Sequence, residues 1–141
     1  MFSSVLALNH QSKRDPEHLF SCLSDMEKFV AVHPVIRKIE PIHPSEFRFY
    51  ETLRFFYIPF SFQYKVEVLA NDKEKTVQMV SNIFGLVDLR LDFIIVPTAE
   101  GNHLEEKVYF KAKVPVLGLM KLVFRKQHKK LFQNIEKKVF F

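Results

Sequence analysis

The last stretch of the chain, residues 117–141, limits the possible folds more than any other part of the sequence. Beyond Gly118 it contains no Pro or Gly and is rich in Leu, Lys and Gln, which favour helix. Its apolar residues recur at steps of three, four or seven on one side: Met120, Val123, Phe124, Leu131, Ile135 and Val139. The pattern predicts one helix roughly 35 Å long, whose apolar side needs a partner of similar length.

The preceding residues alternate between apolar and polar side chains, as the strands of a half-buried sheet do. In residues 60–68, Phe60, Phe62, Tyr64, Val66 and Val68 alternate with polar residues. We expect strands at 2–10, 35–40, 46–56, 60–68, 75–83, 87–95 and 107–114. Clean alternation is typical of an antiparallel sheet with one buried and one solvated face.

Two short helices are predicted after the first strand, at residues 16–23 and 25–31. Asp15 is a good N-cap, and Pro16 and Glu17 suit the first turn of a helix. Asp25 is a second N-cap, and Pro34 prevents the second helix from continuing. The fold class is therefore α+β: a curved antiparallel sheet of about six to seven strands wrapped on a long C-terminal helix.

Length and composition indicate a single domain, residues 1–141, because 141 residues with 48% hydrophobic content can form one substantial core. The single cysteine, Cys22, excludes a disulfide framework. The N-terminus carries no basic, apolar leader and no stretch approaches a membrane span. We therefore expect a cytoplasmic protein without a transmembrane segment.

Positive charge is concentrated on the predicted C-terminal helix. The net charge of the chain is +5, and from residue 117 onward seven Lys and Arg residues face Glu136 alone. One interpretation is a contact of this basic face with RNA, a ribosome or an anionic membrane. The favoured interpretation is a solvated face whose Lys stems cover apolar surface.

The order of elements and several short motifs resemble a known superfamily. The motifs are residues 15–20 (Asp-Pro-Glu-His-Leu-Phe), 23–28 (Leu-Ser-Asp-Met-Glu-Lys), 33–35 (His-Pro-Val) and 113–116 (Lys-Val-Pro-Val). The chain resembles the START/Bet v 1-like helix-grip proteins, in particular the polyketide cyclase/dehydrase-like (SRPBCC) group. The resemblance implies a helix-grip fold holding an apolar molecule between sheet and helix. Some similar proteins catalyse cyclisation or dehydration, and others bind quinones or associate with ribosomes.

No catalytic or cofactor motif is present. The three glycines are far apart, so the sequence has no Gly-rich phosphate loop, and no Ser lies in a GxSxG motif. The six histidines form neither HExxH nor an i,i+4 pair. We expect no cofactor and no metal.

Two polar residues interrupt positions that should face inward. Glu51 shares parity with Phe47, Phe49 and Leu53, and His128 lies in the apolar side of the C-terminal helix. Either both are polar anchors in an apolar cavity, or a bulge turns Glu51 outward and His128 bonds a strand carbonyl. For Glu51 we favour the bulge. For His128 we favour neither the cavity anchor nor the bond to a strand carbonyl.

A small hydrophobic molecule, lipid-, quinone- or polyketide-like, is the expected partner. One helix cannot fill a curled sheet, although large Phe side chains could occupy the remaining space. The candidate ligand-binding residues are Phe49, Glu51, Phe60, Phe62, Tyr64, Met79, Phe93, Phe110, Met120, Phe124 and His128. The alternatives are a cyclase- or dehydratase-type enzyme using His128, Glu51 or Tyr64, and an interaction module using the basic face. Phe140 and Phe141 are expected either in a disordered tail or in a docking contact.

Overall fold

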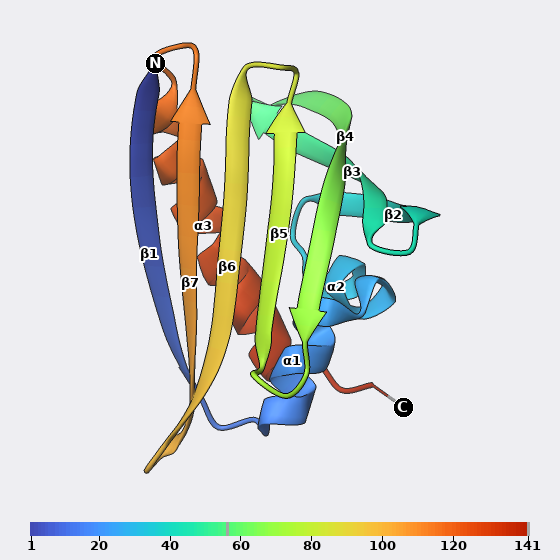
Figure 1. The fold of residues 1–141 in the computed structure, drawn as a ribbon, viewed down its shortest axis with the longest axis vertical. Helices are drawn as coiled ribbons and strands as arrows, with labels where there is room; N and C mark the ends of the chain where they lie inside the picture. The colour runs from blue at the N-terminus through green and yellow to red at the C-terminus, as the bar shows by residue number, and fades with distance from the viewer. Residues whose placement is uncertain (56, 141) are drawn as a thin grey trace.

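The computed structural model describes residues 1–55 and 57–140, apart from the side chain of Phe55, as one sheet and three helices (Figure 1). The helices are α1 (Pro16–Ser24), α2 (Met26–Val32) and α3 (Leu117–Lys137). The strands are β1 (Phe2–Ser12), β2 (Ile36–His43), β3 (Glu46–Phe55), β4 (Ile58–Asn71), β5 (Thr76–Ile83), β6 (Val87–Thr98) and β7 (Gly101–Ala112). This confirms the predicted fold class.

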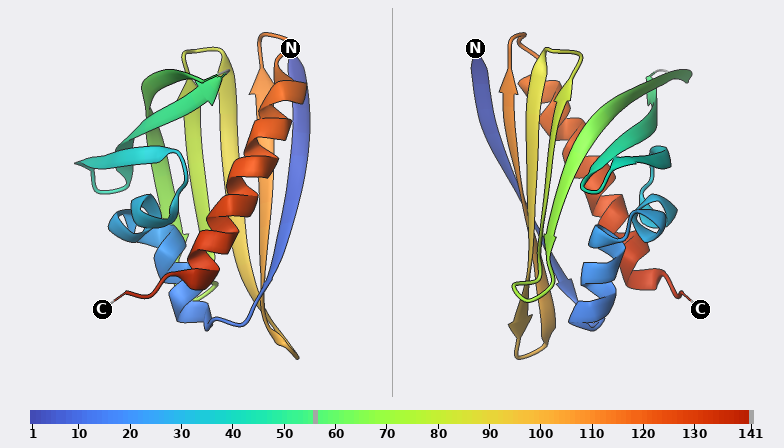
Figure 2. Two further views of the ribbon diagram at one scale, coloured as in Figure 1. Left: turned by 180° about the vertical axis from the view of Figure 1, so that it is seen from behind. Right: turned by 45° about the vertical axis from the view of Figure 1, so that its right-hand side comes forward.

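The seven strands form one antiparallel sheet in the order β1-β7-β6-β5-β4-β3-β2. Strands β2 to β7 follow one another as hairpins, whereas β1 pairs with β7, with Leu6 opposite Val108. Because α1 and α2 separate β1 from β2, these helices carry the chain from one edge of the sheet to the other. Figure 2 shows that the sheet curves and that α3 crosses its inner face diagonally.

The two short helices begin at the predicted N-caps. The Asp15 carboxylate accepts a hydrogen bond from the backbone N–H of His18, and Pro16 occupies the first turn of α1. The Asp25 carboxylate accepts from the N–H groups of Glu27 and Lys28, so the same residue ends α1 and starts α2. Both predicted helices agree with the structure to within one residue.

The helix α3 has two halves with different surroundings. Leu131, Phe132 and Ile135 in its C-terminal half are buried. Leu119 and Leu122 in its first turns are 57% and 63% exposed. The close-packed core therefore lies under the C-terminal half of α3 and against α1 and α2; its fully buried members include Leu19, Leu23, Phe29, Leu104, Val108, Leu131 and Ile135.

The end of the chain differs from the prediction. The helix stops at Lys137, and Lys138 is extended, so the apolar side ends at Ile135 and the inclusion of Val139 was wrong: it is 57% exposed. Phe140 is partly buried, with its ring 6.3 Å from that of His18, so this residue packs on α1 and is not part of a disordered tail. Phe141 lies outside the described residues.

Five strands, β1, β2, β4, β6 and β7, are longer than predicted. The last strand begins at Gly101 rather than at residue 107, because the charged run Glu105, Glu106 and Lys107 hid its continuation. The second strand continues through Pro41 to His43, which is compatible with its place at the sheet edge next to a register shift. The predicted strand 46–56 ends in the structure at Phe55, and Phe56 lies outside the described residues.

Candidate functional site

A cavity of about 230 Å³ separates the N-terminal half of α3 from the sheet. Its walls come from β3, from β4, from the β5–β6 turn with its flanking residues, and from the first three turns of α3. The lining residues are Glu51, Leu53, Phe60, Phe62, Tyr64, Ile83, Phe84, Val87, Leu119, Met120, Val123, Phe124 and Gln127. Since most of them are aliphatic or aromatic, this outer chamber favours apolar contents.

Aromatic rings form one wall of the outer chamber. Along β4 the ring centroids of Phe60 and Phe62 lie 5.4 Å apart, and those of Phe62 and Tyr64 lie 5.6 Å apart. Phe84, from the β5–β6 turn, packs on Phe62 at 5.7 Å. Side chains on one face of a strand are two residues apart, so β4 places three successive rings along the cavity.

The outer chamber opens at the end of the molecule where α3 begins. Phe60, Phe84 and Leu119 line it and are also exposed to solvent. In Figure 2 this end holds the start of α3, the β3–β4 connection and the β5–β6 turn, opposite α1. Access to the chamber therefore does not require the core under the C-terminal half of α3 to open.

A smaller chamber of about 30 Å³ continues inward, and its lining is polar on one side. It shares Glu51, Tyr64, Phe124 and Gln127 with the outer chamber. Its further lining residues are His33, Phe49, Val66, Met79, Ser81, Leu89, Leu91 and His128. A volume of this size holds a water molecule or one small polar group of a ligand.

Glu51 and Tyr64 form one polar pair at the junction of the chambers. The Tyr64 hydroxyl donates to Oε1 of Glu51 at 2.6 Å. Burial raises the pKa of Glu51, and the hydrogen bond from Tyr64 and the nearby His128 offset part of that increase. Burial, followed by the adjacent Glu51 carboxyl, raises the pKa of Tyr64 well above its usual range. Tyr64 is therefore a neutral phenol at physiological pH.

His128 and Glu106 form a second, fully buried pair. The Nδ1 atom of His128 lies 2.7 Å from Oε1 of Glu106, which is 0% exposed. As a carboxylate accepts, Nδ1 is the donor, and the other ring nitrogen, Nε2, is left for the inner chamber. The Oε2 atom of Glu106 has no hydrogen-bond partner among residues 1–55 and 57–140. A buried pair of this kind holds the imidazole in one orientation.

His33, which follows α2, supplies a third polar group. Its Nδ1 accepts hydrogen bonds from the backbone N–H groups of Val35 and Ile36, at 3.2 and 3.1 Å, so in the neutral ring Nε2 carries the proton. Burial, and then the neighbouring His128, lower the pKa of His33 well below its ordinary value. Its ring meets that of His128 edge to face at 5.8 Å. His33 therefore contributes a neutral N–H group to the site.

The structure brings nine of the predicted site residues to the two chambers: Phe49, Glu51, Phe60, Phe62, Tyr64, Met79, Met120, Phe124 and His128. Phe93 and Phe110 line neither chamber. Phe93 stacks behind His128 at 6.5 Å, and Phe110 packs edge to face on Phe124 at 5.2 Å, so both support the walls from outside. The role of all these residues in ligand binding stays a prediction.

The two polar exceptions also have clear positions. The bulge favoured for Glu51 lies on the neighbouring strand, where β2 shifts register between Ile36 and Lys38, so the interpretation that Glu51 turns outward was wrong. His128 bonds the side chain of Glu106 and not a strand carbonyl. Both residues face the cavity.

Three functional candidates were not predicted from the sequence: His33, Glu106 and Gln127. Glu106 shares the parity of Leu104 and Val108, and this signal could have shown it as inward-facing. Gln127 lies three residues after Phe124, on the cavity side of α3. No local pattern points to His33, because it lies in a connection and tertiary packing alone places it beside His128.

Within the described part of the chain, no group of three or more His, Cys, Asp or Glu side chains is placed to hold a metal ion. No helix there is long and apolar enough to cross a bilayer. On α3, Arg125, Lys126, Lys129 and Lys130 are exposed, as predicted for the basic face. A contact of this face with RNA or an anionic membrane, like the cytoplasmic location, stays a prediction.

Comparison with known proteins identifies the fold. No protein-family model and no curated protein matches the sequence. Among solved structures, a START superfamily protein from Mycobacterium smegmatis superimposes with a TM-score of 0.75 at 17% identity, with 94% of each chain covered. The Zhui aromatase/cyclase from Streptomyces sp. R1128 gives 0.74 at 6% identity, covering 95% of this chain and 92% of that one. Ara h 8.0201 gives 0.73 at 14% identity, with 96% of each chain covered.

The class that these structures define is the START/Bet v 1-like helix-grip fold, and this chain has that fold. The resemblance inferred from the residues is thereby confirmed for the fold. At such low identities the likeness carries no information about a ligand or a reaction.

Proposed function

We propose that the protein binds one small hydrophobic molecule between α3 and the sheet, with its apolar part in the outer chamber and one polar group in the inner chamber. The observation that carries this proposal is the outer chamber itself, about 230 Å³ of space lined mainly by apolar side chains and open at one end. A close-packed core of this size leaves few voids larger than a water molecule.

Volume and polarity narrow the chemical class of the ligand. A dry apolar cavity of about 150 Å³ in another protein binds benzene, so the outer chamber has room for one substituted ring or a short acyl chain. The inner chamber offers the N–H of His33, the Nε2 atom of His128 and the carboxyl of Glu51. These groups suit a hydroxyl or carbonyl oxygen. A quinone- or phenol-like ring, or a short lipid chain, therefore fits better than a multi-ring polyketide.

A matched pair of substitutions on α3 tests binding. Val123→Trp places two rings in the outer chamber, and Lys126→Trp places the same side chain on the exposed side of the helix. Isothermal titration calorimetry should detect binding of 2,6-dimethylphenol or octanoate to the wild type and to Lys126→Trp. Val123→Trp should lose most of this binding while it unfolds cooperatively. Equal binding by both variants would contradict the proposal.

A second candidate function is an acid–base reaction on a bound carbonyl compound. It is favoured by the buried Glu106–His128 pair, which orients an imidazole towards the same small chamber as the neutral phenol of Tyr64 and the carboxyl of Glu51. In this arrangement His128 would remove a proton next to the carbonyl, and the N–H of His33, or the Tyr64 hydroxyl after it turns away from Glu51, would donate to the developing oxyanion.

Proton exchange measures this candidate reaction without knowledge of the natural substrate. In deuterium oxide, the wild type should speed the exchange of the α-protons of 2-tetralone, followed by proton NMR, and His128→Gln should abolish the effect. Glu106→Gln should shift the pH profile of the exchange, because it alters the pairing of Nδ1. An exchange rate equal to that in buffer would remove the enzymatic candidate and leave binding intact.

A further inference from the structure

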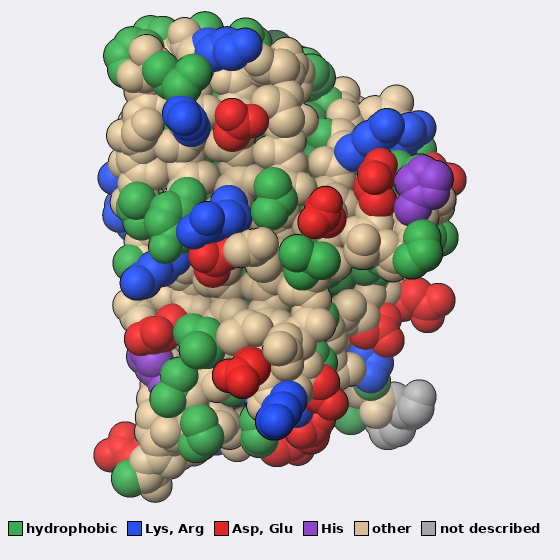
Figure 3. Space-filling view, viewed as in Figure 1, with side chains coloured by type: hydrophobic (Ala, Val, Ile, Leu, Met, Phe, Trp, Pro, Cys, Tyr) green, Lys and Arg blue, Asp and Glu red, His purple; other side chains and the backbone are tan. Residues whose placement is uncertain are grey.

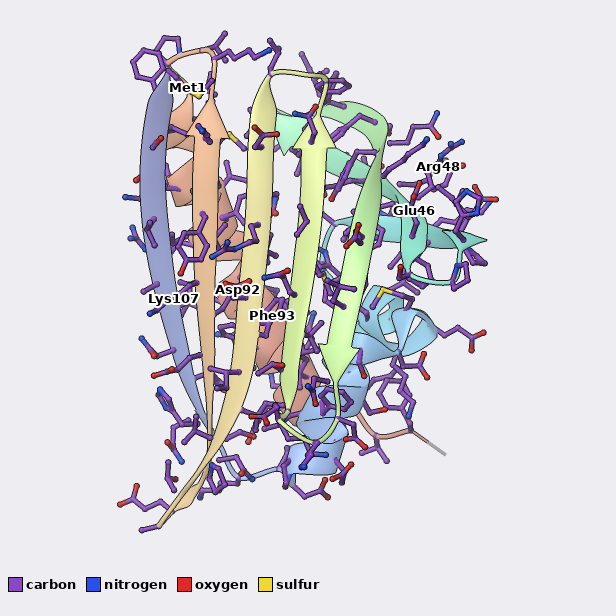
Figure 4. All side chains as sticks on the ribbon, in the orientation of Figure 1. Met1, Glu46, Arg48, Asp92, Phe93 and Lys107 are labelled. Atoms are coloured by element: carbon purple, nitrogen blue, oxygen red, sulfur yellow. The ribbon has the colours of Figure 1, made fainter. Side chains whose placement is uncertain are left out.

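Exposed apolar side chains gather at the end of the molecule where the outer chamber opens. They come from four segments: residues 1–2, 57–60, 84–86 and 119–122. Most of the large exposed hydrophobic residues in the described part of the chain belong to these segments. Figure 3 shows hydrophobic side chains along this upper end, and Figure 4 places Met1 there. We call this set of segments the apolar end.

The two turns at the apolar end carry aromatic residues that stay exposed, although Phe84 also packs on Phe62. Tyr57 and Phe84 have φ angles of 70° and 57°, a region that favours Gly, Asn or Asp in turns. Tyr57 is 96% exposed, so its ring contributes almost nothing to the core. An aromatic residue placed at a strained and exposed position offers its apolar surface to something outside the chain.

Positive charge surrounds the apolar end. Arg54 pairs with Pro59 across the β3–β4 hairpin, and the backbone of Lys113 bonds that of Leu86 at 2.9 Å. Lys121 lies between the exposed Leu119 and Leu122 on α3. Lys111 on β7 pairs with Asp88 on β6, and the Asp88 carboxylate accepts a hydrogen bond from Asn82. Apolar tips ringed by mainly basic side chains match the interface of a membrane with anionic head groups.

We propose that the apolar end docks on an anionic lipid bilayer, with the mouth of the outer chamber facing the membrane. The exposed tips come from separate turns and a helix face, and so fit a laterally extended apolar layer better than a single peptide. Phe84 and Leu119 both line the chamber and belong to the apolar end, so a docked protein exposes the chamber directly to the bilayer. This surface goes beyond the proposed ligand binding, and vesicle binding can be measured without any ligand.

Vesicle flotation tests the docking. The probes are vesicles of phosphatidylcholine alone and vesicles in which phosphatidylserine replaces part of it. The triple variant Tyr57→Asn, Phe84→Asn and Leu122→Gln removes apolar surface but suits the local backbone, since Asn tolerates positive φ. The control, Leu69→Thr, Val96→Thr and Val139→Ser, removes exposed apolar side chains from outside the apolar end.

The wild type and the control should float with anionic vesicles at low salt, and the partition coefficient of the triple variant should fall by about tenfold or more. Lys113→Gln and Lys121→Gln should each weaken binding to anionic vesicles by about fivefold. Binding to neither type of vesicle by the wild type, or equal losses in the triple variant and the control, would overturn the proposal. So would concentration-dependent dimers that the triple variant abolishes, because a second copy would then cover this surface.

Discussion

Glu51 shows at the scale of one residue how the site combines a carboxyl group with apolar surroundings. Its side chain accepts from Tyr64, and its burial raises its pKa. A raised pKa means that the folded state favours the neutral acid more than the unfolded state does. The stability that this difference contributes is fully present below the unfolded pKa, about 4.3, and is lost as the pH rises through the folded pKa.

Glu51→Gln should remove this pH dependence, because Gln keeps an oxygen for the Tyr64 hydroxyl and does not titrate. The free energy of unfolding of the wild type, taken relative to that of the variant, should fall as the pH rises from about 4 to about 8. Urea titrations at several pH values measure it. Parallel profiles for the two proteins would show that Glu51 is solvated in the folded state.

The rings of Phe93 and Phe124 differ in what lies beside them, and their removal should differ accordingly. Phe93 is 2% exposed behind His128, so Phe93→Ala should cost about 3–5 kcal/mol through lost burial and a new cavity. Phe124 lines both chambers, so Phe124→Ala only enlarges existing space and should cost nearer the transfer free energy, about 1.5–3 kcal/mol. Urea unfolding compares the two. Equal losses at both positions would indicate that the chambers are filled in solution.

At the scale of elements, the C-terminal end of α3 is tied to the end of β1. The Glu136 carboxylate accepts from the hydroxyl of Ser12 at 2.5 Å and from the backbone N–H of Lys13 at 3.1 Å. The guanidinium of Arg14 donates to the carbonyls of Glu136 and Lys138, both at 2.8 Å. These bonds hold the buried half of α3 in place while its first turns stay exposed over the cavity.

Glu136→Ala should therefore lower the free energy of unfolding by about 1.5–3 kcal/mol, the range for hydrogen bonds to a charged group. Partial burial alone would raise the pKa of Glu136, but the bonds from Ser12, Lys13 and His10 lower it on balance. The loss should thus be present above the unfolded pKa and shrink as the pH falls through the folded pKa. Glu105→Ala is the control, since its surface pair with His103 at 3.7 Å should contribute about 0–1 kcal/mol. Equal losses of unfolding free energy in Glu136→Ala and Glu105→Ala would contradict a stabilising role of the hydrogen bonds to Glu136.

For the whole molecule, sheet and helix depend on each other. The inner face of the sheet is covered by α3, and the fully buried Leu104 and Val108 of the sheet belong to the same core as Leu131 and Ile135 of α3. A fragment ending at Gly118 should consequently lose its fixed tertiary packing while it keeps some strand structure. Near-ultraviolet circular dichroism and urea titration measure this. A fragment that unfolds in one cooperative transition would show that the sheet is stable without the helix.

The pattern of the sequence alone determined the elements and their order. The alternation in residues 60–68, the caps Asp15 and Asp25, and the three-four spacing from Met120 to Ile135 are local signals. Each depends on the geometry of a single strand or helix, which is why they predicted the fold class. The same signals placed Glu51 and His128 on inward positions before any partner was known.

The tertiary structure alone decided which polar groups meet and where space remains. Glu106 and His128 are 22 residues apart in sequence, and His33 reaches the same chamber from the connection after α2. The volume of the outer chamber depends on the angle at which α3 crosses the curved sheet, and the bulge next to Glu51 arose on β2 and not on β3. Periodicity predicts the face of a strand or helix on which each side chain lies. It does not predict the distance between elements, because packing of the whole chain sets that distance.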